Sequence, residues 1–193
     1  MSLITLFSAP KAFTDPVARR LQRNAIGSWT RLPDVDTLLL GEEDGLAEAA
    51  SELGAHLNSK VARNPNGVPL VSSMLELARE ASSSPLLCII NADIILTSDF
   101  VDAAKQVASV VADPSAGATP AGLKPFVLLS RRWDLDVPEP LEFAGAGRNA
   151  FERPPGPEAA CTGPQAATSS CSHATATPTC RASPSGAPGG TTG

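Results

Sequence analysis

The chain has 193 residues, enough for one domain of ordinary size and a tail, and its 15 Lys and Arg against 20 Asp and Glu give a formal net charge of −5. Because a general nucleic-acid-binding protein neutralises phosphates with a basic face, this balance argues against that class. No apolar run approaches the roughly 18 residues of a membrane-spanning helix, and the N-terminus lacks the basic leader and apolar core of a secretory signal. The expected location is the cytoplasm.

Short apolar runs alternate with helical patterns from the N-terminus onward. The first run, residues 3–7 (LITLF), precedes a helix that Asp15 can cap, with Pro16 at its first position. The second run, residues 36–40 (DTLLL), precedes a helix with an acidic first turn that ends at Gly54. Both runs have strand length, so the pattern predicts strand, helix, strand, helix.

The same alternation continues through the middle of the chain. A short strand is expected at 55–58 (AHLN), followed by a helix that starts at a capping box formed by Ser73 and Glu76. A strand at 86–90 (LLCII) and a helix capped by Ser98 come next. The apolar stripe of each predicted helix has the spacing of one buried face.

Residues 125–129 (PFVLL) form the last predicted strand. All these runs are too short for helices and too continuously apolar for half-exposed strands, which is typical of strands covered on both faces of a parallel sheet. Alternating strands and helices predict an α/β domain with three layers, a largely parallel sheet flanked by helices.

The composition changes sharply near residue 144. Ala, Gly, Pro, Ser and Thr dominate from there on, and no Leu, Ile, Val, Met or aromatic residue follows Phe151. Such a segment buries too little apolar surface to offset its ordering entropy, so we predict a structured domain at 1–143 and a disordered, low-complexity tail at 144–193. A frameshift or a wrongly predicted exon would also produce this shift.

Asn91 and Asp93 interrupt the apolar character of the chain directly after the strand at 86–90. In open α/β sheets, ligands bind beyond the carboxyl ends of the strands. Residues two apart on an extended chain point the same way, and an amide and a carboxylate oxygen suit Mg²⁺ or Mn²⁺, which can in turn hold a diphosphate. The alternative is that Asp93 caps the turn before the next helix.

Two adjacent arginines, Arg131 and Arg132, follow the predicted strand at 125–129. Guanidinium groups at a strand end could neutralise a diphosphate. Because neighbours on a strand face opposite ways, we expect one of them to point toward the ligand and the other to pair with Asp134 or Asp136.

Residues 3–143 resemble a known family in the order of several stretches. These are ITLFSAPKAF, QRNAIGSW, VARNPNGVPLVSSMLELAREA and LLCIINADIIL, with FVLLSRRWDLDV after the last strand. They are similar to glycosyltransferase-like proteins with the GT-A, or nucleotide-diphospho-sugar transferase, fold. The resemblance implies an Asp-x-Asp-type motif that ends the fourth strand and binds a divalent metal with the sugar-nucleotide diphosphate. Asn91 and Asp93 match it, with Asn in place of the usual first Asp.

The same resemblance implies further contacts with the donor. The loop after the first strand usually contacts the nucleoside, and the segment before the central strand helps to hold the base or the sugar. An alternative for NPNG is a tight turn in which Gly67 takes a positive φ, and Lys11 is as easily a solvated surface lysine. The substrate-binding residues implied in this way are Ser8, Pro10, Lys11, Arg63 and Asn64.

The low-complexity tail stands where an enzyme of this family has its acceptor-binding segment. The sequence therefore predicts a metal-dependent glycosyltransferase domain that binds a nucleoside diphosphate sugar with Mn²⁺ or Mg²⁺, is catalytically incomplete, and has no identified acceptor. The alternative is a non-catalytic α/β domain that binds a nucleotide sugar or a protein partner. A nucleotidyltransferase would need a glycine-rich loop after the first strand, and SAPKAF has no glycine.

Overall fold

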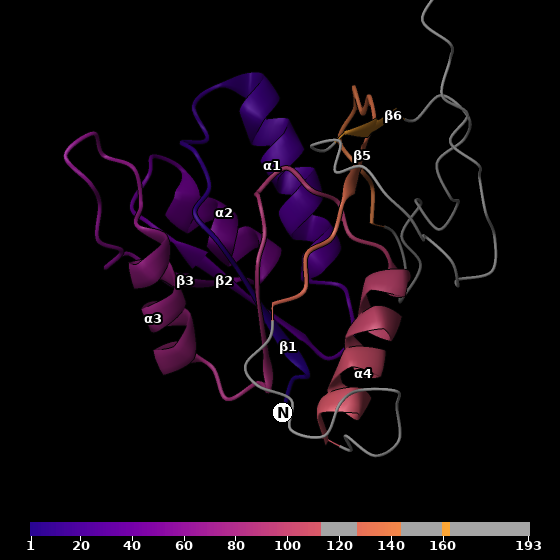
Figure 1. Cartoon of the computed structure of the whole chain (residues 1–193). Coiled ribbons are helices and arrows are strands. Elements are labelled where there is room, and N and C mark those ends of the chain that lie inside the picture. The colour runs from indigo at the N-terminus through magenta and orange to yellow at the C-terminus, as the bar shows by residue number, and fades with distance from the viewer. Residues whose placement is uncertain (113–126, 144–159, 163–193) are drawn as a thin grey trace, which may run out of the picture. The chain divides into compact units, whose positions relative to one another are not determined.

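A computed structural model describes residues 1–112, 127–143 and 160–162 of the chain (Figure 1). Four strands form one parallel sheet in the order β3-β2-β1-β4. The strands are β1 (Ile4–Ser8), β2 (Val35–Leu40), β3 (His56–Asn58) and β4 (Leu86–Ile89). The helices are α1 (Pro16–Trp29), α2 (Leu46–Leu53), α3 (Val71–Ala81) and α4 (Ser98–Ala112). The predicted α/β class with a parallel sheet is confirmed.

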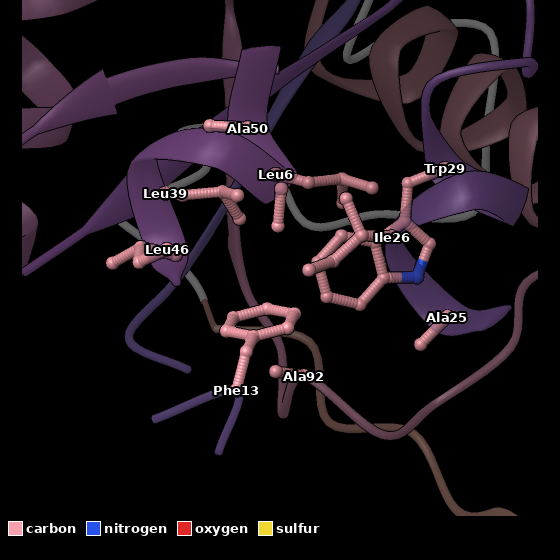
Figure 2. Close-up of a cluster of buried hydrophobic side chains, with 10 residues drawn as sticks. Leu6, Phe13, Ala25, Ile26, Trp29, Leu39, Leu46, Ala50 and Ala92 are labelled. Atoms are coloured by element: carbon pink, nitrogen blue, oxygen red, sulfur yellow. The ribbon is translucent and has the colours of Figure 1, made fainter. Parts of the chain in front are cut away.

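One face of the sheet is covered by α1 and α2. Figure 2 shows the side chains of Leu6 and Leu39, from β1 and β2, gathered with Trp29 and Ile26 of α1 and with residues of α2. Trp29 and Ile26 are completely buried. Phe100 at the start of α4 and Leu96 just before it pack against the same cluster, so the β4–α4 connection shares this core.

The opposite face is covered by α3. Phe7 and Leu38, which alternate with the residues of the first cluster along β1 and β2, pack with Met74 and Ala78 of α3. The sheet therefore has helices on both faces, which gives the three layers that the continuous apolar strands predicted.

Two helix ends form as the sequence indicates. The Asp15 carboxylate accepts a hydrogen bond from the Ala18 N–H at 2.7 Å, and Pro16 occupies the first turn of α1. Gly54 ends α2 with φ 76°, the left-handed conformation that glycine adopts most easily.

The predicted capping box of the third helix is wrong. α3 begins at Val71, after Leu70, and has no side-chain cap. Ser73 lies inside its first turn, where the Ser73 Oγ accepts a hydrogen bond from the Ala62 N–H at 3.0 Å. The hydroxyl therefore satisfies a distant backbone donor of the preceding loop instead of a donor of its own helix.

The predicted strand at 125–129 is not formed in its described part. Val127, Leu128 and Leu129 lie outside any strand and are 85%, 68% and 87% exposed, while 125–126 lie outside the described residues. An apolar run becomes a strand only when a neighbouring strand satisfies its backbone groups, and Val127, Leu128 and Leu129 have no partner strand within the described residues. The next strand is β5 (Arg132–Asp134), which starts three residues later.

β5 pairs antiparallel with β6 (Ala160–Thr162), so three residues of the predicted tail form a strand. The remainder of 144–193 lies outside the described residues, and the predicted boundary at 143 and the disorder of that part stay predictions. In the part of the chain that the structure describes, no helix has both the length and the apolar character needed to cross a membrane.

Leu6→Ala should lower the free energy of unfolding by about 3 kcal/mol, because Leu6 is fully buried between the sheet and α1 and its removal leaves a cavity. Denaturant unfolding followed by circular dichroism measures the change. Val17→Ala is the matched control, since Val17 is 51% exposed on α1 and should change stability by less than about 0.5 kcal/mol. Equal effects of the two substitutions would contradict the assigned core.

Candidate functional site

The strand order brings the loops after β1 and β4 side by side. From β1 the chain proceeds to β2 and β3 on one side, whereas β4 adds to the other side of β1. Phe7 of β1 lies opposite Ile89 of β4, and the Ile90 N–H donates to the Phe7 carbonyl at 3.1 Å just beyond the end of β4. The strand order thus reverses at β1, and ligands of open α/β sheets bind at such a point.

Three of the predicted residues lie at the end of β1 and in the loop that follows it. Ser8 is 1% exposed and Pro10 is buried, so both shape the loop from inside. The backbone of Lys11 is held from both sides by Gln22 of α1: its N–H donates to Oε1 at 2.7 Å, and its carbonyl accepts from Nε2 at 3.0 Å. Of the three side chains, that of Lys11 is the exposed one.

The loop after β4 carries Asn91 and Asp93, and both are exposed. The Ile94 N–H donates to the Asn91 carbonyl at 3.2 Å, so residues 91–94 form a turn. Asn91 and Asp93 therefore do not lie on an extended chain, which the sequence analysis had assumed. The Asp93 carboxylate has no hydrogen-bond or ion-pair partner among the described residues, so it does not cap the turn.

The conformation of this loop is set by the end of α1. The Trp29 indole N–H donates to the Ile94 carbonyl at 2.7 Å. The Ser28 hydroxyl accepts from the Leu96 N–H at 3.0 Å and donates to the Ala25 carbonyl at 2.6 Å. Both side chains belong to buried residues, and they hold the loop that presents Asp93.

Arg63 and Asn64 lie in the loop after β3, at the far edge of the sheet from β4. The Arg63 guanidinium forms a 2.6 Å ion pair with Glu43 and donates to the Gly67 carbonyl at 2.9 Å. The Asn64 side-chain oxygen accepts from the Asn66 and Val68 N–H groups. Gly67 has φ 78°, so the tight-turn interpretation of NPNG is confirmed, and both side chains are engaged in stabilising it.

The Arg63–Glu43 pair also depends on Gly41. With φ 132°, Gly41 adopts a backbone conformation that favours glycine, and a Cβ atom there would collide with the Glu43 carboxylate. The second Glu43 oxygen, Oε2, is buried without a hydrogen-bond partner in the part of the chain that the structure describes. The sequence signal for this arrangement is the GEE triplet that follows β2. Its two glutamates precede α2, which begins at Leu46, and so they do not form an acidic first turn of that helix.

Arg131 and Arg132 lie at the start of β5, outside the main sheet, and both are exposed. The Arg132 Nε donates to the Asp134 carboxylate at 3.1 Å, which confirms that one of the two arginines pairs with Asp134. The predicted residues that the structure brings together are therefore those after β1 and β4. Arg63, Asn64 and the two arginines belong to other parts of the molecule.

No group of three or more His, Cys, Asp or Glu side chains is positioned to hold a metal among the described residues. A divalent ion at Asp93 and Asn91 would therefore complete its coordination with water and with oxygens of a bound phosphate, which is the usual mode of Mg²⁺.

The chain matches no protein-family model, and no curated protein is significantly similar to it in sequence. Its function is therefore inferred from its own residues.

Arg63→Ala should destabilise the protein by about 2 kcal/mol, because the Arg63–Glu43 side chains are only 26% and 18% exposed and Glu43 would lose its partner. The matched control is Arg23→Ala. The Arg23–Glu52 pair has the same 2.6 Å separation but is 33% and 58% exposed, so its loss should cost about 0.5 kcal/mol or less. Denaturant unfolding compares the two, and an equal cost would contradict a structural role for Arg63.

Burial raises the pKa of the Cys88 thiol above its ordinary value of 9.0. Alkylation of Cys88, followed by mass spectrometry of its peptide, should therefore be much slower in the folded chain at pH 8 than in urea. The thiol ionises at a lower pH in the unfolded chain than in the folded one. The contribution of the protonated Cys88 to folding stability is therefore complete below pH 9.0 and is lost as the pH rises through the pKa of the folded state. Equal alkylation rates in both states would contradict the burial of this thiol.

Proposed function

We propose that this domain binds a nucleoside diphosphate sugar together with Mn²⁺ or Mg²⁺ beyond the carboxyl ends of β1 and β4. The supporting observation is the reversal of strand order at β1, which sets the Lys11 loop beside the loop of Asn91 and Asp93. An exposed ammonium group and an exposed carboxylate in adjacent loops suit a ligand that carries both phosphates and a divalent cation.

Each side chain has a distinct role in this proposal. The Asp93 carboxylate supplies the charged metal ligand, and the Asn91 amide oxygen supplies a weaker neutral one. Lys11 neutralises part of the diphosphate charge, and its backbone is already fixed by Gln22, so only its side chain must be ordered on binding. In glycosyl transfer, the bound cation would stabilise the charge that develops on the departing diphosphate.

The reaction class that fits this donor is transfer of the glycosyl group to an acceptor hydroxyl. Transfer needs both partners held in reacting geometry, which can supply about 7–11 kcal/mol of barrier lowering. The groups identified at the site all belong to the donor side. We therefore expect this chain to bind the donor more effectively than it turns it over.

A second candidate is a non-catalytic nucleotide-sugar-binding domain. It is favoured by the engagement of Arg63 and Arg132 in ion pairs with Glu43 and Asp134, which leaves fewer cationic groups for transition-state charge. Donor binding without hydrolysis or transfer is the result expected for this candidate.

Asp93→Ala should reduce donor binding in the presence of Mn²⁺ at least tenfold, because it removes the charged metal ligand. Calorimetric titration with UDP and GDP, each with Mn²⁺ and with EDTA, measures the affinity. Asp102→Ala is the matched control, since Asp102 is an exposed carboxylate on α4 and lies outside the 91–97 loop. Metal-dependent binding that Asp93→Ala leaves intact would refute the assignment of the ligand.

A glycosyl-hydrolysis assay on the purified full chain separates the two candidates. Multiple turnovers with UDP-sugars or GDP-sugars would favour the enzyme and show that more of its machinery lies within this chain. Binding without turnover would favour the non-catalytic domain, and the absence of both would refute the proposed function.

A further inference from the structure

The last two turns of α1 are enclosed on every side. Residues 24–29 are six consecutive buried residues, although a helix that packs on a sheet by one face buries only part of each turn. The sheet and α2 cover one side through Ile26 and Trp29. Residues 139–143 and the 91–97 loop cover other sides.

Residues 139–143 form one of these covers, which we call the latch. The Asn24 side chain, 3% exposed, donates from Nδ2 to the Glu139 carbonyl at 3.0 Å and accepts at Oδ1 from the Leu141 N–H at 2.8 Å. The amide of Asn24 thus bonds to the latch backbone as a neighbouring strand would. A buried amide is costly unless it is bonded, so undocking the latch requires that water reach Asn24.

Gly27, one turn after Asn24 on α1, and Arg31, just beyond the end of the helix, extend this contact. A Cβ atom on Gly27 would come within 2.7 Å of the Phe143 ring, so the absence of a side chain lets the ring lie against the helix. The Arg31 guanidinium covers the ring, 4.3 Å from its centroid, and donates to the Gly27 carbonyl at 2.7 Å. The aromatic ring is therefore held between backbone and cation.

The loop that presents Asp93 forms the other cover. Ser28 and Trp29 bond to the backbone of Leu96 and Ile94, within five residues of Asn24 along α1. The same two helical turns thus carry the latch on one side and the loop on another. Loss of the latch would expose Asn24 and Gly27 to water and allow the end of the helix to fray, because glycine weakens a helix once packing is lost.

We propose that residues 139–143 are a detachable latch whose docking on α1 holds the 91–97 loop in place. Three of its five side chains are exposed, those of Glu139, Pro140 and Glu142. The side chains that oppose its release are therefore mainly those of Leu141 and Phe143. The latch and the loop are coupled through α1, and the coupling acts in both directions. If the coupling regulates ligand binding at the donor site, that regulation rests on the function proposed above.

Amide hydrogen exchange of the full chain tests the latch directly. The Leu141 N–H reports its docking, and the Leu96 N–H reports the loop. Asn24→Ala should speed the exchange of both amides roughly tenfold while the amides of β1 and β2 keep their protection. Val17→Ala, at the other end of α1, is the matched control and should change neither amide.

Gly27→Ala provides a second variant that does not depend on removing a buried polar group. The added methyl displaces the Phe143 ring but favours the helix itself, so the fold should persist. It too should speed the exchange at Leu141 and Leu96. Faster exchange at Leu141 with no change at Leu96 in both variants would overturn the coupling, and no change at Leu141 would overturn the latch.

Hydrogen exchange measured with a nucleotide present distinguishes failure of the latch from failure of the proposed function. If the wild-type chain binds UDP or GDP with Mn²⁺, saturation should slow the exchange of Leu96 and also that of Leu141. Slowing at Leu96 alone would overturn the coupling. If no nucleotide binds, the proposed function fails, whereas the exchange of the ligand-free variants still decides the latch.

Discussion

The burial of polar side chains on α1 is the constraint on which the rest of the structure depends. Gln22, Asn24 and Ser28 are 5%, 3% and 0% exposed, and each bonds to the backbone of a different segment. A buried polar group without a partner costs more than its hydrogen bond contributes to stability when it is made. The segments cannot leave α1 without exposing the three polar side chains to water or leaving them without a hydrogen-bond partner. A single helix therefore fixes the loop after β1, the loop after β4 and residues 139–141.

This arrangement separates two tasks that a binding site must combine. The sheet sets which loops are neighbours, because its order puts β4 beside β1. The helix then sets their conformations, through Gln22 to Lys11 and through Trp29 to Ile94. Loops whose backbones are bonded before a ligand arrives lose less entropy on binding, since only exposed side chains remain to be ordered.

The sequence predicted most of the elements that depend on local chemistry, although the capping box expected of Ser73 and Glu76 did not form. The continuous apolar strands, the Asp15 cap and Gly54 all follow from properties of neighbouring residues, and the structure confirms them. The partners of Asn24 were not predictable, because the bonded segment lies 115 to 117 residues away and a polar helix residue usually faces water. The run at 125–129 misled for a related reason: apolar character indicates a strand, but only a partner strand makes one.

Asn91 and Asp93 show that the conformation of a short motif depends on residues outside it. Their spacing suggested two ligands on one side of an extended chain, but residues 91–94 are a turn. The direction of the Asp93 carboxylate therefore depends on that turn, whose last carbonyl is held by the indole of Trp29 from a helix 65 residues earlier. In the proposed metal site, one exposed carboxylate and one amide would bind an ion weakly by themselves, so their placement would have to come from such supporting contacts. The conformation of the motif thus depends on Ser28 and Trp29 of α1, which bond to the backbone of its loop. In the sequence, these two residues look like ordinary residues of a helix.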